Sequence, residues 1–92
     1  MKERWKIILT GRVQGVGLRY LIKIRTWQNS LTGWVGNIQK GQVLIEVEGS
    51  NLDLEKFVNW LKQNPGWSRV VECQVNKINL QNDNSFLIKF NL

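Results

Sequence analysis

With 92 residues, 42% of them hydrophobic, the chain is long enough for one small core, so we expect a single domain over residues 1–92. It has no apolar run of membrane length, no signal-peptide pattern and one cysteine, which favours a cytoplasmic protein without membrane contacts. The absence of histidine argues against a transition-metal site. The net charge of +6 is spread over isolated Lys and Arg residues and favours attraction of small anions over binding of nucleic acid.

The apolar run that begins at Trp5 predicts a first strand over residues 5–10, and a glycine-rich stretch, residues 11–19 (GRVQGVGLR), follows it. Its three glycines permit positive φ angles between the strand and the helix that comes next. Consecutive N–H groups in such a turn can form an anion-binding nest, to which a helix N-terminus adds donors and a dipole. Arg19 would add a planar guanidinium that can hold two phosphate oxygens. The stretch therefore predicts a phosphate cradle.

Three common phosphate loops do not fit this stretch. A Walker A loop requires Lys and Ser or Thr after its last glycine, where this chain has Leu18 and Arg19. A dinucleotide-binding loop requires a third glycine, where Tyr20 stands, and a cysteine phosphatase requires a thiolate, where Val13 stands. A cradle without a nucleophile leaves water as the attacking group.

Residues 19–29 are expected to form a helix with two apolar or partly apolar faces. One face carries Leu18, Ile22, Thr26 and Asn29, and the other carries Tyr20, Ile24, Trp27 and Leu31. Periodicity by itself favours the second face as the buried one.

The middle of the chain predicts two strands, residues 34–38 and 42–48, joined by a hairpin turn at residues 39–41. In the second strand three residues are expected to face the core and three to face outward: Val43, Ile45 and Val47 inward, Leu44, Glu46 and Glu48 outward. Ser50 with Asp53 resembles a capping box at the start of a second helix. The buried stripe of that helix comprises Leu54, Phe57, Val58 and Leu61, and Asn64-Pro65-Gly66 ends it.

The C-terminal third predicts a strand over residues 70–80, a turn over 81–85 and a last strand containing Phe86, Ile88 and Phe90. Cys73 alternates with Val71 and Val75, so we expect it to be a small core residue. The order β-α-β-β-α-β plus a short final strand predicts an α+β, ferredoxin-like sandwich. Its mainly antiparallel sheet would be covered on one face by two helices.

Two motifs together resemble the acylphosphatase family: residues 11–19, and residues 33–37 (GWVGN) after the expected helix. The family patterns are GRVQGVGFR and GWVxN, and the family domain has nearly the length of this chain. The departures are Leu18 for Phe, Lys40 where Asp is frequent and Ser30 where Gly is usual.

The resemblance implies hydrolysis of acyl phosphates to a carboxylate and inorganic phosphate, without metal or cofactor. It assigns phosphate binding to Gln14, Gly15, Val16, Gly17, Leu18 and Arg19, and it assigns Asn37 to positioning the attacking water. It also favours Leu18, Ile22 and Thr26 as the buried side of the first helix.

Two alternatives remain at this point. A nucleic-acid-binding module of the same fold would stack bases on aromatic side chains of the open sheet face. The outward positions of the two expected central strands hold no aromatic residue and include Glu46 and Glu48, which disfavours it. A non-catalytic anion-binding domain within a larger assembly is the other alternative. We expect a monomer, with weak self-association through Ile24 and Trp27 if these are exposed.

Overall fold

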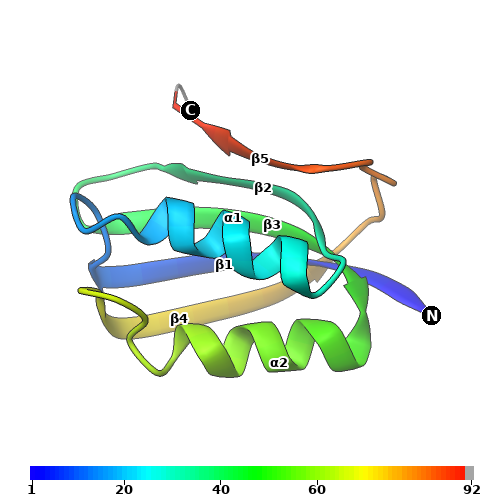
Figure 1. Cartoon of the computed structure of the whole chain (residues 1–92), viewed down its shortest axis with the longest axis horizontal. Helices are drawn as coiled ribbons and strands as arrows, with labels where there is room; N and C mark the ends of the chain where they lie inside the picture. Colours follow the sequence, from blue (N-terminus) through cyan, green and yellow to red (C-terminus); the bar gives the residue numbers. More distant parts are fainter. Residues whose placement is uncertain (91–92) are drawn as a thin grey trace.

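Five strands form one sheet, and two helices cover one of its faces (Figure 1). The computed structural model describes residues 1–90. The elements are β1 (Lys2–Arg12), α1 (Leu18–Gln28), β2 (Thr32–Asn37), β3 (Gln42–Ser50), α2 (Asn51–Leu61), β4 (Arg69–Ile78) and β5 (Phe86–Lys89). The strand order is β4-β1-β3-β2-β5, and only the β2–β5 pair is parallel. The predicted ferredoxin-like α+β sandwich and its element order are confirmed.

The core lies between the helices and the two central strands. Ile7 and Leu9 of β1 and the three inward residues of β3 are completely buried, as their alternation predicts. The predicted stripe of α2 is buried as well. The backbone N–H of Asp53 donates to Ser50 Oγ at 3.1 Å, so the expected cap begins this helix.

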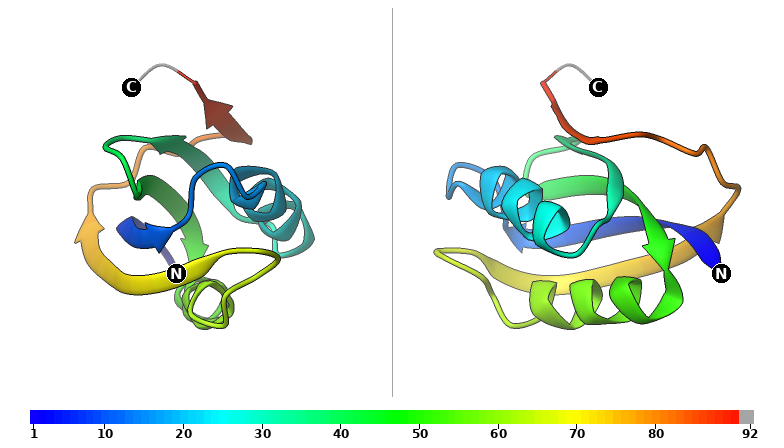
Figure 2. Two further views of the ribbon diagram at one scale, coloured as in Figure 1. Left: turned by 90° about the vertical axis from the view of Figure 1, so that its left-hand side faces the viewer. Right: turned by 45° about the vertical axis from the view of Figure 1, so that its right-hand side comes forward.

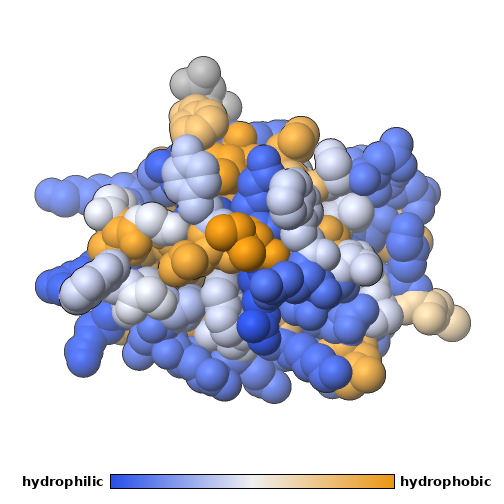
Figure 3. Space-filling view, viewed as in Figure 1, coloured by the Kyte–Doolittle hydropathy of each residue, from blue (hydrophilic) through white to orange (hydrophobic). Residues whose placement is uncertain are grey.

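The face of α1 that turns to the core is the one implied by the family resemblance. Leu18, Ile22 and Thr26 are buried, whereas Ile24 and Trp27 are 52% and 70% exposed. Thr26 is tolerated inside because its hydroxyl donates to the Lys23 carbonyl at 2.8 Å. The prediction from periodicity, that the other face is buried, is wrong, because both faces of the helix carry large apolar side chains. Figure 3 shows the resulting apolar surface over α1, bordered by hydrophilic residues.

Leu31, which helical periodicity places on the same face as Ile24 and Trp27, lies in the core, whereas those two residues are exposed. The helix ends at Gln28, and Ser30 adopts a left-handed conformation with φ 56°. The N–H of Leu31 then donates to the Thr26 carbonyl at 2.9 Å, which turns the chain and directs the Leu31 side chain inward.

A β-bulge interrupts the alternation expected along β4. Thr10 lies opposite Glu72 and Gly11 opposite Val70, so Val71 is an extra residue in the edge strand. Its side chain is 77% exposed, and the prediction that it shares an inward face with Cys73 is wrong. Cys73 is half-buried against the core, and burial raises the pKa of its thiol.

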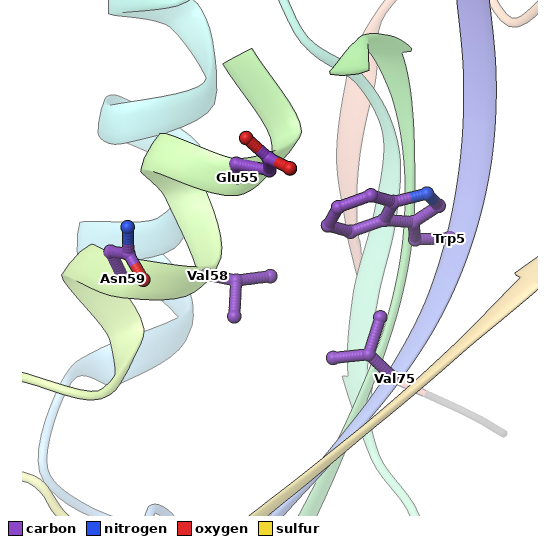
Figure 4. Close-up of a pocket in the computed structure, with 5 residues that line it drawn as sticks. All are labelled: Trp5, Glu55, Val58, Asn59 and Val75. Carbon is purple, nitrogen blue, oxygen red and sulfur yellow. The ribbon is translucent and has the colours of Figure 1, made fainter. Parts of the chain in front are cut away.

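The inner face of β4 is only partly covered by α2. A surface hollow of about 370 Å³ lies there, with Trp5, Val58 and Val75 as its apolar walls and Glu55 and Asn59 at its side (Figure 4). It contains no residue of the glycine-rich turn.

The connection between β4 and β5 buries two charged residues on the open face of the sheet. Arg4 and Glu48 are each 1% exposed, and the Arg4 guanidinium donates to Glu46, Asp83 and Glu48 at 3.0, 3.0 and 3.4 Å. The Glu48 carboxylate also accepts the N–H groups of Gln81 and Asn82 at 2.8 and 3.0 Å. Glu48 does face away from the helices, as predicted, but the connection shields it from solvent.

Candidate active site

The glycine-rich turn between β1 and α1 has the backbone geometry of an anion nest. Gly15 and Gly17 have φ angles of 71° and 74°, whereas Gln14, Val16 and Leu18 between and around them keep negative φ. Such alternation turns successive N–H groups toward one concave side. A Cβ added at either glycine would meet no atom within 4 Å, so these positions require glycine for backbone conformation and leave open space above the loop.

The N–H groups of this turn are without acceptors. Within residues 1–90, no backbone N–H from residue 14 to residue 19 donates a hydrogen bond to a protein atom. Helix α1 begins here with no side-chain cap and no acidic residue in its first turn. The positive end of the helix dipole and its first donors are therefore available to an anion.

Hydrogen bonds brace the turn against the β2–β3 hairpin. The Gln14 side-chain amide donates to the carbonyls of Gln39 and Gln42, the latter at 2.7 Å. The N–H of Gly11 donates to the Gly41 carbonyl at 3.0 Å. The Gln14 side chain is engaged in these bonds, whereas its backbone N–H has no acceptor among residues 1–90. Sequence reasoning missed the bracing by Gln39 and Gln42, since it depends on backbone carbonyls that any residue type supplies.

Arg19 lies in the first turn of α1 and is half-buried. Among residues 1–90 it forms no ion pair, and its Cζ lies 5.4 Å from the centroid of the Phe90 ring. No Asp or Glu occurs between Glu3 and Glu46, whereas Lys and Arg recur through this segment. The guanidinium is thus an uncompensated positive charge beside the nest, and Phe90 is a neighbour that the sequence did not indicate.

Asn37 ends β2 opposite Val43, next to the hairpin that braces the turn. Its side chain lies on the helix-covered face, because Val35, two residues earlier in the strand, is fully buried in the core. The Asn37 Oδ1 is buried and has no hydrogen-bond partner among the described residues. A buried acceptor of this kind can hold a water molecule.

The structure therefore brings the predicted residues to one end of the molecule, where the turn, the hairpin and the start of α1 meet (Figure 1). Leu18 is 1% exposed, so its side chain belongs to the core and only its N–H faces the turn. No group of three or more His, Cys, Asp or Glu side chains within residues 1–90 is placed to hold a metal ion. In the same part of the chain, neither helix is long and apolar enough to cross a membrane.

Comparison with known proteins identifies the family. A profile of the acylphosphatase family matches residues 5–88. The acylphosphatase of Clostridium beijerinckii is 39% identical over 88 residues, covering 95% of this chain and 98% of the relative. The crystal structure of acylphosphatase from Bacillus subtilis matches with a TM-score of 0.90 at 36% identity, covering 97% of this chain and 99% of that one.

A larger protein contains the same fold. Full-length HypF in its phosphate- and nucleotide-bound form matches 97% of this chain with a TM-score of 0.87 and 30% identity, over 12% of its own length. The profile match and the near-complete overlap with the Clostridium and Bacillus proteins are decisive, and the chain belongs to the acylphosphatase family.

Proposed function

We propose that this enzyme, which hydrolyses acyl phosphates to a carboxylate and inorganic phosphate, holds the phosphoryl group with the N–H groups of residues 14–19 and with Arg19. Asn37 positions the attacking water in this proposal. The observation that supports it is the row of N–H groups from residue 14 to residue 19, which have no acceptor among residues 1–90 and lead directly to a guanidinium that forms no ion pair within the same residues. The orphaned Asn37 Oδ1 supports the place of the water.

In this proposal the reaction needs no side chain as a general acid or general base. As the water oxygen forms its bond to phosphorus, the bond between phosphorus and the acyl oxygen breaks and its electron pair leaves with the carboxylate. The carboxylate needs no protonation, and the proton lost by water passes to a phosphate oxygen of the substrate. The transition state of phosphoryl transfer is loose, so positioning and electrostatic stabilisation supply most of the rate.

A neutral amide suits the water site. In the proposal the Asn37 Oδ1 accepts a hydrogen bond from the water and adds no negative charge beside the phosphate. The nest and Arg19 provide the positive field, so we propose that the reaction needs neither metal nor cofactor. Turnover that is unchanged in excess EDTA would support this part of the proposal.

The decisive experiment compares the wild type with Arg19→Lys and Arg19→Ala on benzoyl phosphate in EDTA. Lysine keeps the charge but cannot make the bidentate contact, so both variants are expected to lose on the order of 100-fold or more in kcat/KM. Inhibition by inorganic phosphate should weaken in parallel, because product and substrate share the phosphate site. Turnover within a few-fold of the wild type in either variant would contradict the role of Arg19. Phosphate binding without turnover in the wild type would indicate the non-catalytic alternative.

We also propose that the protein is a cytoplasmic monomer and that it does not bind nucleic acid. On the open face Glu46 stands beside Lys6 and Trp34, and the Lys89 ammonium lies 4.3 Å from the Trp34 ring, so this aromatic surface is already occupied. Weak self-association is proposed through the exposed face of α1 with Ile24 and Trp27. Sedimentation at rising concentration tests it, because Trp27→Lys should abolish any association.

A further inference from the structure

We infer that Trp67, on the loop between α2 and β4, contacts the acyl group of the substrate and favours planar, apolar acyl groups over acetyl. The inference rests on the proposed function, because it depends on where the phosphate and the water are bound. Trp67 is 84% exposed, and none of the aromatic or cation–π contacts within residues 1–90 includes it.

The loop that carries Trp67 is held against both ends of the cradle. Arg69, where β4 begins, pairs with Arg12 at the end of β1. Gly66 packs on the first turn of α1 so closely that an added Cβ would lie 2.6 Å from Leu21 Cδ1. Figures 1 and 2 show this loop and the cradle side by side at the same end of the molecule.

The reaction geometry directs the acyl group toward this side. In an in-line displacement the leaving oxygen departs on the side of phosphorus opposite the attacking water. Asn37 belongs to β2, which lies beyond β3 on one side of β1, whereas β4 and its loop lie on the other side of β1. With the water at Asn37, the acyl group therefore points toward the loop with Trp67.

Hydrogen bonds within the loop hold the backbone on both sides of Trp67. The N–H and hydroxyl of Ser68 both donate to the Pro65 carbonyl, at 3.2 and 2.7 Å, and Val70 N–H donates to Asn64 Oδ1 at 2.7 Å. Ser68 is buried, so the chain turns inward directly after Trp67. The backbone of the loop therefore needs no reordering when the indole contacts a ligand, and an indole stacks better on an aromatic ring than on a methyl group.

The test compares benzoyl phosphate with acetyl phosphate. Trp67→Ala should lower kcat/KM for benzoyl phosphate on the order of three- to tenfold, mainly through KM, and leave acetyl phosphate within about twofold. Trp67→Phe should retain most of the preference. Trp27→Ala is the matched control, because it removes another exposed indole that lies about 14 Å along α1 from the cradle. It should leave kcat/KM unchanged for both substrates.

The outcomes separate this inference from the proposed function. If the wild type hydrolyses both substrates and Trp67→Ala leaves the benzoyl-to-acetyl ratio unchanged, the inference is wrong and the proposed function stands. An equal loss on both substrates would make Trp67 a structural residue and also overturn the inference. If the wild type hydrolyses neither substrate, the proposed function fails, and the inference falls with it. Inhibition by inorganic phosphate should remain at the wild-type value in Trp67→Ala, because the indole lies outside the phosphate site.

Discussion

Asn37→Ala should separate activity from stability. The Oδ1 atom is buried and accepts no hydrogen bond from residues 1–90, so its removal breaks no hydrogen bond within the described part of the chain. The remaining cost is the lost packing of a half-buried side chain, which is on the order of 1 kcal/mol. We therefore expect the free energy of unfolding to fall by no more than about 1 kcal/mol.

Activity should move much further. If Asn37 holds the water mainly on the way to the transition state, its removal lowers kcat on the order of 100-fold, equivalent to about 2.7 kcal/mol. The phosphate inhibition constant should stay near its wild-type value, since the nest and Arg19 remain. The assays are urea unfolding followed by tryptophan fluorescence, and steady-state hydrolysis of benzoyl phosphate with and without added phosphate.

Asn29→Ala provides the control. Asn29 Nδ2 is also buried without a partner among the described residues, but this residue caps the far end of α1. Its removal should leave kcat unchanged. The reasoning is refuted if Asn37→Ala destabilises the fold by more than 2 kcal/mol, roughly the cost of breaking a satisfied buried hydrogen bond. A loss of phosphate affinity as large as that of Arg19→Ala would make Asn37 a binding residue instead.

Three further predictions concern stability. Glu48→Ala should lower the free energy of unfolding by about 3 kcal/mol, because it removes one of the three carboxylates around the buried Arg4 guanidinium and leaves the N–H groups of Gln81 and Asn82 without their acceptor. Glu48→Gln should cost less, and urea titration measures both. Ser30→Gly should raise the free energy of unfolding by about 0.5–1 kcal/mol, because glycine adopts the positive φ of this position without strain. An unchanged midpoint of urea unfolding would contradict this. Because burial raises the pKa of the Cys73 thiol in the folded state, the neutral thiol contributes fully to the free energy of unfolding below pH 9.0, and this contribution is lost as the pH rises through the folded-state pKa. In Cys73→Ala, unfolding measured across alkaline pH should not show this loss.

The cradle could be predicted from sequence because its geometry depends on residue type at fixed positions. Gly15 and Gly17 are the residues that positive φ requires, and Arg19 follows on the first helical turn. The inward-facing residues of β3 and α2 could also be predicted from the sequence, because each element has a regular pattern with a single apolar face.

Other features depend on contacts that no local pattern records. The shielding of Glu48 comes from residues 81–83, more than thirty positions further along the chain. The exposure of Val71 results from a bulge set by its pairing with β1. For α1 the family motif succeeded where periodicity failed, since Tyr20, Ile24 and Trp27 form an apolar stripe that the sheet leaves uncovered.

The phosphate site that we propose is built from backbone N–H groups, and such a site should respond to mutation in an unusual way. At Val16 most side-chain changes would leave every donor in place, because the donor belongs to the main chain. At Gly15 and Gly17 any side chain is disfavoured by φ although an added Cβ would meet no atom within 4 Å, so a substitution there would act through the torsion angle that orients the N–H groups. A saturation scan of this loop should thus show tolerance and intolerance alternating residue by residue, in step with the sign of φ. That alternation would distinguish recognition by the main chain from recognition by side chains, for which tolerance follows proximity to the ligand.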